Sequence, residues 1–126
     1  MNVVDSSGWL EYFADGGNAD FFSAPIEDPE TLIVPTISLY EVFKKVLQLR
    51  NETEALQSVA HMQLGRVVDL TTPIALSAAH LSFQLKIPMA DSMILATSRA
   101  YQATLWTQDE DFEGLDGVHY QAKISQ

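Results

Sequence analysis

Acidic side chains follow several of the short apolar segments of the sequence. Asp5 comes directly after Val3-Val4, and Asp109 follows the apolar segment 104–107 after one residue. Glu41 and Asp91 each lie near the start of a predicted helix. Carboxylates gathered at one place repel one another unless a cation neutralises them. Oxygen ligands suit Mg²⁺ or Mn²⁺, and a pair of such ions can support hydrolysis of a phosphodiester bond.

The elements that would position these acids follow from periodicity and punctuation. Apolar segments predict strands at 3–4, 31–34, 66–70 and 104–107, with an edge strand at 118–121. Helices are predicted from a Ser6 or Ser7 cap to about 16, and at 18–24 (stopped by Pro25), 38–50, 51–64, 72–85 and 91–100. This alternation predicts one α/β domain over 1–126, a mostly parallel sheet with helices on both faces. Ligands bind at the carboxyl ends of such strands.

Each acid also has an ordinary structural explanation. Asp5 and Asp91 fit helix caps, and Asp109 fits a polar turn. Ser38 and Glu41 have the S-x-x-E spacing of a capping box, and Glu41 precedes Lys45 by four residues, as in a helical ion pair. The prediction of a shared site therefore depends on the matched positions of the acids, since no single acid requires it.

Composition excludes several classes of protein. Hydrophobic residues make up 47% and charged residues 19%, as in a globular domain. Without cysteine there are no disulfides, thiolate zinc sites or cysteine nucleophiles. The N-terminus does not resemble a signal peptide, and no apolar run approaches the ~20 residues that span a bilayer, so we expect a soluble cytoplasmic protein. The net charge of −10 disfavours nucleic acid unless bound cations change the local field, and it predicts a basic protein partner.

The sequence around the acids resembles that of PIN-domain proteins, especially the VapC-type toxin ribonucleases. Residues 3–7 (VVDSS), followed by Trp9-Leu10, resemble the opening of these proteins. Residues 38–42 (SLYEV) resemble their second acidic motif, and 87–96 (IPMADSMILA) their third. Residues 105–112 (LWTQDEDF) are similar to the fourth, of form T-x-D-x-D-F. The resemblance extends over nearly the whole chain.

This resemblance implies a PIN fold with a four- or five-stranded parallel sheet, and Mg²⁺- or Mn²⁺-dependent endoribonuclease activity in a toxin–antitoxin pair. It implies a catalytic, metal-binding quartet: Asp5, Glu41, Asp91 and Asp109. It further implies that Asp111 is an outer acid that binds metal through water, and that Ser6 and Thr107 orient carboxylates or water. A homodimer, and inhibition by an antitoxin with a basic or aromatic-rich tail, are also implied.

Few cations are present to hold an RNA, because Lys and Arg together number 7. Lys44 and Lys45 lie one turn beyond Glu41 and are candidate phosphate contacts, with a solvated helix face as the alternative. Arg99 lies two turns after Asp91 and is a candidate phosphate contact or salt-bridge partner.

Other functions fit parts of the sequence. A haloacid-dehalogenase-type phosphatase also has an aspartate after its first strand, but it requires a second two residues later, where this chain has Ser7. A signalling receiver domain requires a lysine after a late strand, and here Gln108 follows Thr107. A PIN-like binding protein without catalysis remains open.

Histidine metal sites are not predicted, because the histidines show no i, i+4 pairing: His61, His80 and His119. Aromatic residues near the N-terminus are predicted to belong to the core, with a peptide-binding groove as the alternative: Trp9, Tyr12, Phe13, Phe21 and Phe22.

Overall fold

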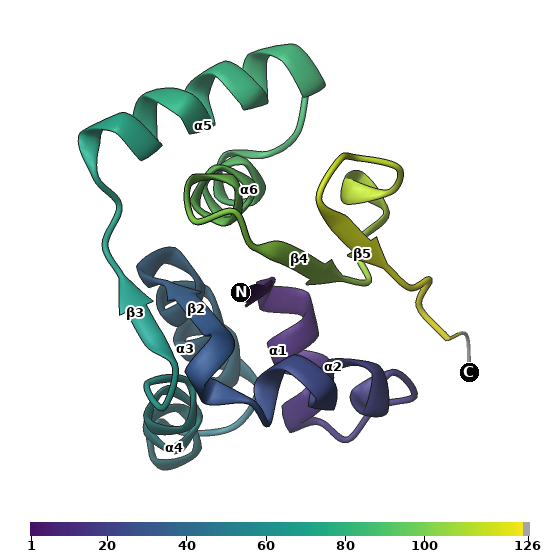
Figure 1. Ribbon diagram of the computed structural model, residues 1–126. Helices are drawn as coiled ribbons and strands as arrows, with labels where there is room; N and C mark the ends of the chain where they lie inside the picture. Colours follow the sequence, from purple (N-terminus) through teal and green to yellow (C-terminus); the bar gives the residue numbers. More distant parts are fainter. Residues whose placement is uncertain (125–126) are drawn as a thin grey trace.

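A computed structural model shows a parallel five-stranded sheet between two layers of helices (Figure 1). The structure describes residues 1–124. The strands are β1 Asn2–Val4, β2 Leu32–Pro35, β3 Arg66–Val68, β4 Thr104–Thr107 and β5 Val118–Tyr120. They lie in the order β3-β2-β1-β4-β5, and every neighbouring pair is parallel. The predicted α/β class with a parallel sheet is confirmed.

The strand order reverses at β1, which lies between β2 and β4. Val4 at the end of β1 pairs in register with Trp106 of β4, so both strands end at the same edge. Open parallel sheets bind ligands at such a reversal, outside the carboxyl ends of the strands. The fold therefore places residues that follow β1 and β4 side by side.

The helices are α1 Ser6–Phe13, α2 Ala19–Ile26, α3 Thr36–Leu49, α4 Glu52–Met62, α5 Thr72–Leu85 and α6 Met89–Ala100, with 3-10 helices η1 Pro29–Thr31 and η2 Glu110–Phe112. Helices α5 and α6 pack on one face of the sheet, and α1 to α4 supply the core on the other. Among residues 1–124, no helix combines the length and apolar character needed to cross a membrane.

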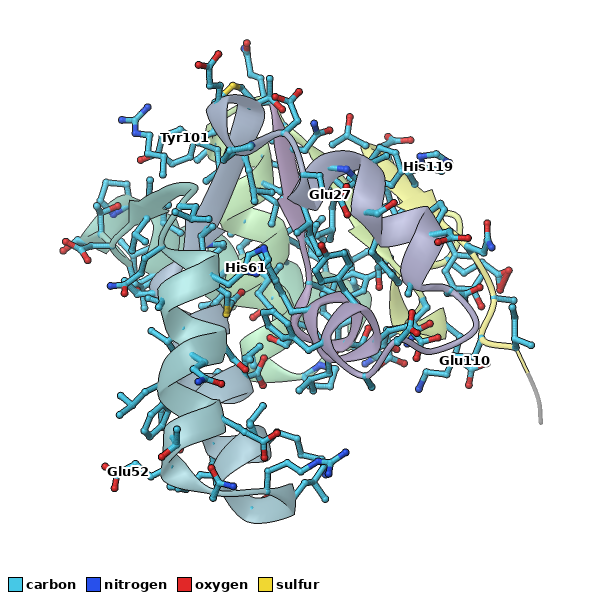
Figure 2. The ribbon with its side chains drawn as sticks, turned by 90° about the horizontal axis from the view of Figure 1, so that it is seen from below. Glu27, Glu52, His61, Tyr101, Glu110 and His119 are labelled. Carbon is cyan, nitrogen blue, oxygen red and sulfur yellow. The ribbon has the colours of Figure 1, made fainter. Side chains whose placement is uncertain are left out.

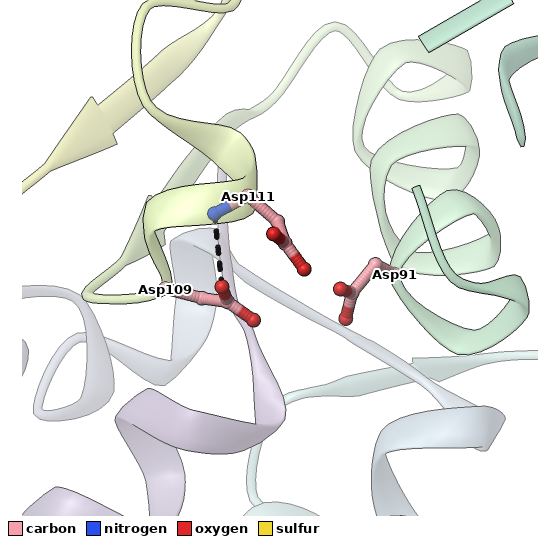
Figure 3. A group of neighbouring side chains, drawn as sticks. All are labelled: Asp91, Asp109 and Asp111. Carbon is pink, nitrogen blue, oxygen red and sulfur yellow. Dashed lines mark hydrogen bonds between the residues drawn. The ribbon is translucent and has the colours of Figure 1, made fainter. Parts of the chain in front are cut away.

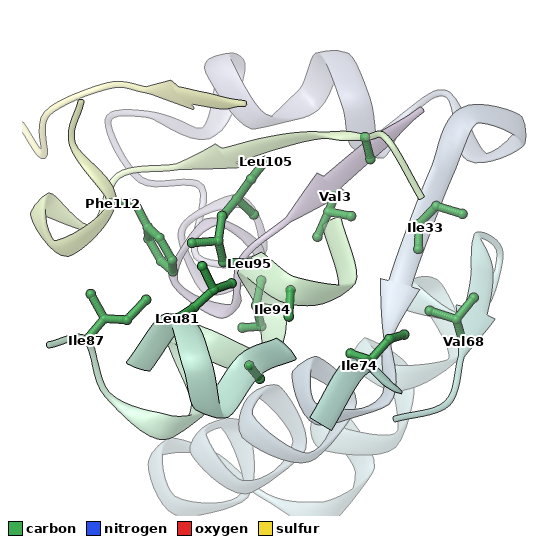
Figure 4. Close-up of a cluster of buried hydrophobic side chains, with 13 residues drawn as sticks. Val3, Ile33, Val68, Ile74, Leu81, Ile87, Ile94, Leu95, Leu105 and Phe112 are labelled. Carbon is green, nitrogen blue, oxygen red and sulfur yellow. The ribbon is translucent and has the colours of Figure 1, made fainter. Parts of the chain in front are cut away.

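Successive residues of the central strands point to opposite faces, as a period of two requires. Val3 and Ile33 pack against α5 and α6 (Figure 4), whereas Val4 and Val34 pack against the other helical layer. Each of these four side chains is 0% exposed. Burial on both faces explains why the strands read as continuous apolar runs without polar alternation.

Some predicted helix boundaries were wrong. Pro25 lies inside α2, one residue before its end, where a proline removes only a hydrogen bond of the last turn. Helix α3 begins at Thr36, because Pro35 supplies the extended N-cap position directly after β2. Ser38 therefore does not open α3. Asp5, not Ser6 or Ser7, caps α1.

Candidate metal centre

Three aspartates converge at the carboxyl edge of the sheet. One carboxylate oxygen from each of Asp91, Asp109 and Asp111 lies within 4.8 Å of the others (Figure 3). Asp109 follows β4 and caps η2, and its Oδ1 accepts a hydrogen bond of 2.9 Å from the Asp111 N–H. Asp91 approaches from the first turn of α6, which begins at Met89 after an extended Pro88. The start of α6 and the turn after β4 thus place their acids face to face.

Asp5 lies behind this group and is only 2% exposed. Its carboxylate accepts hydrogen bonds from the Gly8 N–H at 2.9 Å and from the Ser7 hydroxyl at 2.9 and 3.0 Å. Burial raises the pKa of the Asp5 carboxyl to about 6, although these donors and Thr107 oppose the rise. Asp5 therefore caps α1, and its charge contributes to the raised pKa of Asp91, although it is not one of the three acids whose oxygens meet.

Gly8 permits this arrangement because α1 packs very closely on its neighbours. A Cβ atom at position 8 would lie 2.5 Å from the Phe22 ring and 2.7 Å from Val4. Any side chain there would push α1 away from β1 and α2, and the N–H that caps Asp5 would move with it.

The Thr107 hydroxyl links two of the acidic segments. It donates to Asp5 Oδ2 at 2.7 Å and accepts from the Asp109 N–H at 2.9 Å. Thr107 itself is 0% exposed. One buried hydroxyl therefore holds the end of β1 and the turn after β4 in a fixed relation.

We predict that Thr107→Val lowers the free energy of unfolding by about 1–3 kcal/mol, because it leaves buried polar partners unsatisfied. Thr107→Ser keeps the hydroxyl and should recover most of the loss. Urea denaturation of the three proteins measures the difference. Equal stability of the valine variant and the parent protein would contradict this account of the hydroxyl.

Glu41 is held by a residue of another helix. The Ser6 hydroxyl of α1 donates to Glu41 Oε1 of α3 at 2.6 Å. The alternative explanation of Glu41 as part of a capping box is wrong, because Ser38 lies inside α3 and its buried hydroxyl has no partner in the described residues. Ser6 therefore fixes the orientation of the Glu41 carboxylate.

The pKa of Asp91 responds to the charges of all the other acids. Its pKa is raised to about 7, first by burial and then by the negative charges of Asp109, Asp5, Asp111 and Glu41. Such crowding of carboxylates is unfavourable without a cation. The donor set, all carboxylate oxygens, is the one that hard divalent ions prefer. The residues present therefore fit a Mg²⁺ or Mn²⁺ site.

Two of the predicted basic contacts have partners other than these acids. The Lys44 ammonium lies 5.8 Å from the centre of the Tyr40 ring. The Arg99 guanidinium donates to the Asp116 carbonyl oxygen at 3.2 Å. Arg99 lies eight residues beyond Asp91 on α6, about 12 Å along the helix axis. Of the predicted contacts, only Lys45 lines the groove that adjoins the site at Ser7.

A buried polar network beside Asp109 was missed. Asn18 is 1% exposed, and its Nδ2 donates to Gln108 Oε1 and to the Ala122 carbonyl oxygen, both at 3.0 Å. Gln121 Nε2 donates in return to Asn18 Oδ1 at 3.1 Å. These partners are between 90 and 104 residues away from Asn18 in the sequence, so no local pattern indicates the network. It ties the C-terminal segment to the residue next to Asp109.

Some of the N-terminal aromatic residues lie in the core, and others lie beside α4. Trp9 and Phe22 are fully buried, as expected for the core. Tyr12 and Phe13 surround His61 of α4 with ring centres 5.7 and 5.5 Å away, and Figure 2 shows His61 on the side of α4 that faces α1. His61 thus packs among aromatic rings and is not one of the residues gathered around the acids.

Comparisons with known proteins agree with this geometry. The family model described as PIN domain matches residues 3–118. No curated protein sequence gives a significant match. A toxin-antitoxin complex from Klebsiella pneumoniae is similar in structure, with a TM-score of 0.80, 21% identity and coverage of 98% of this chain and 100% of that one.

Two further structures share the fold. VapC20 of Mycobacterium tuberculosis, described as a sarcin-ricin loop cleaving toxin, has a TM-score of 0.77 at 15% identity and covers 92% of this chain and 95% of its own. A DNA-bound VapBC from Salmonella typhimurium has a TM-score of 0.74 at 14% identity, with 97% of both chains covered. At these identities the likeness establishes the fold.

Proposed function

The chain belongs to the PIN-domain family, and from this premise we propose that it is a metal-dependent endoribonuclease and the toxin of a toxin–antitoxin pair. The observation that carries the proposal is the convergence of Asp91, Asp109 and Asp111 within 4.8 Å. This group lies at the strand-order reversal, where such sheets bind ligands. The likeness to a toxin that cleaves the sarcin-ricin loop supports RNA as the substrate.

Asp91 and Asp109 would hold the Mg²⁺ or Mn²⁺, with Asp111 as an outer acid and Asp5 and Glu41 completing the site. A bound divalent ion would activate the attacking water and neutralise charge on the phosphoryl oxygens. Three hydrogen-bond donors already occupy Asp5, and a carboxylate has about four acceptor positions. Asp5 therefore keeps room for one further ligand or water.

The protein's own residues fix the geometry of this chemistry. Ser6 orients Glu41, and Thr107 orients Asp5 while it holds the backbone N–H of Asp109. These contacts limit the freedom of the carboxylates before substrate binds, as hydrogen-bonded outer partners do at metal sites. A net charge of −10 would repel RNA from a site without cations, so metal binding also prepares the site for substrate.

The proposed partners follow from surface and charge. An acidic toxin favours an antitoxin with basic residues. A homodimer would cover some of the large apolar side chains that are exposed on α5 and at the start of α6: Leu76 at 69%, Phe83 at 83% and Met89 at 68%. We propose a cytoplasmic location, because that is where the protein would meet the proposed RNA substrate.

We predict that the protein cuts a structured RNA, such as a sarcin-ricin-loop hairpin, at internal positions in Mg²⁺ or Mn²⁺. Chelation by EDTA should stop the cleavage, and added metal should restore it, because carboxylates alone cannot activate the water. Gel analysis of end-labelled hairpin gives the cut positions. Cleavage that continues under chelation would point to a metal-independent mechanism.

A further inference from the structure

A groove of about 620 Å³ runs between α1, α3 and α4 and adjoins the acidic centre at Ser7, whose hydroxyl donates to the Asp5 carboxylate. Ser7 and Gln108 line it, and these residues are two positions after Asp5 and directly before Asp109. One water accounts for roughly 30 Å³ in the liquid. The groove is therefore large enough for part of a polymer that continues away from the metal centre.

The groove gathers an unusual share of the positive charge. The chain has 7 Lys and Arg against 17 Asp and Glu. Lys45 and Arg50 line the groove from the α3 side, and Lys123 lines it from the C-terminal segment. Three of the seven basic side chains thus face one groove of a strongly acidic protein.

The acidic side chains of the groove are engaged in local hydrogen bonds. Glu11 Oε2 accepts from the Asn18 N–H at 2.8 Å. Glu54 Oε2 accepts from Nδ2 of Asn51, the residue that caps α4, at 3.2 Å. Each of these carboxylates therefore has a partner on its own side of the groove.

The position of Lys123 depends on the buried Asn18 network. Gln121 and Ala122 are both hydrogen-bonded to Asn18, which also bonds Gln108 beside Asp109. This network fixes the backbone immediately before Lys123. The C-terminal segment thus brings a cation from the far end of the chain to the groove next to the metal centre.

We propose that this groove holds the RNA strand that flanks the scissile phosphate, with Lys45, Arg50 and Lys123 as its phosphate contacts. The inference rests on the proposed function. A metal ion serves the reacting phosphate, and the neighbouring phosphates need separate cations. These three side chains suit the groove to a polyanion. The rest of the lining includes apolar and acidic side chains such as Leu10, Phe13 and Glu11, so a protein partner is the other occupant that the test must separate.

The test combines Lys45→Ala, Arg50→Ala and Lys123→Ala, singly and together, with Arg66→Ala as the charge-matched control. Arg66 lies on β3 with its guanidinium 5.4 Å from the Tyr101 ring. Hairpin RNA binding is measured by fluorescence anisotropy in Ca²⁺, whose looser coordination should slow hydrolysis, across a series of salt concentrations. Hydrolysis of bis(4-nitrophenyl) phosphate in Mg²⁺ reports the metal centre alone.

The triple variant should bind RNA at least about tenfold more weakly, and its salt dependence should be shallower by about two in log–log slope, because each lost single-strand contact removes about 0.7. Hydrolysis of the small diester should stay unchanged, and Arg66→Ala should bind like the parent protein. Unchanged RNA binding in the triple variant would overturn the inference and leave the groove to a protein partner. Equal weakening by Arg66→Ala would overturn it as well. Groove-dependent RNA binding without any RNA cleavage would support the groove and contradict the proposed activity.

Discussion

Replacing Asp91 with asparagine should lower the rate of RNA cleavage by at least about 10²-fold. Loss of a residue that only supports a metal ligand already lowers metal affinity or activity roughly 10–100-fold. Asp91 is closer to the reaction than such a residue, because it faces Asp109 and Asp111 directly (Figure 3). The neutral amide keeps the size of the side chain but removes the charge that would bind the cation. Initial rates on the hairpin RNA at saturating Mg²⁺ measure the change.

The same substitution should raise the melting temperature of the metal-free protein near pH 8. Burial and four neighbouring acids raise the pKa of Asp91 to about 7, so its ionised form is disfavoured in the folded protein. Asparagine removes that repulsion. Such opposite effects on stability and activity are expected where a site stores unfavourable charge for function.

Glu52→Gln is the control for this experiment. Glu52 is an exposed acid in the first turn of α4 (Figure 2), away from the acidic centre, and its substitution is also an acid-to-amide change. It should leave both the cleavage rate and the melting curve almost unchanged. An Asp91→Asn protein that cleaves RNA normally and still gains stability from Mg²⁺ would contradict the role assigned to Asp91.

Local signals in the sequence were sufficient for several elements. The strand at 104–107 and the helix at 72–85 have the predicted bounds, because apolar runs and the Thr72-Pro73 start mark them directly. The Asn51 cap of α4 is also confirmed. The start of α3 was missed because Pro35 is both the last residue of β2 and the N-cap of α3. Such a direct transition from strand to helix depends on packing, and no local pattern marks it.

The acidic site was predictable for a topological reason. Residues after parallel strands meet at one edge of the sheet, and the pairing of β1 with β4 makes Asp5 and Asp109 neighbours there. For Asp5 the structure shows the helix cap, and it also places the carboxylate close enough for its charge to raise the pKa of Asp91. The Asn18 network and the position of Lys123 depend on contacts across the whole chain, and no spacing rule reveals them.

The stability of the protein should also fall as pH rises, and it should fall less steeply with metal than without it. The folded-state pKa values of Asp5 and Asp91 are raised from 3.8 to about 6 and about 7. Between about pH 4 and pH 7 the folded protein therefore binds more protons than the unfolded chain, and stability falls as pH rises. The melting temperature of the metal-free protein should be lower near pH 8 than near pH 5.

Divalent ions bind the deprotonated carboxylates, so the stability gained from Mg²⁺ should grow as pH rises. At a concentration of 100 times Kd the gain is about 2.7 kcal/mol, or roughly 10 °C for a chain of this size. Melting curves at several pH values, with Mg²⁺ and with EDTA, measure both trends, and Asp91→Asn should weaken both. Parallel curves with and without metal would mean that the ion does not displace protons from these acids. In the parent protein, the plots of melting temperature against pH with Mg²⁺ and with EDTA should move apart as pH rises. If these two plots come together in Asp91→Asn, the same group of carboxylates binds both the metal and the protons.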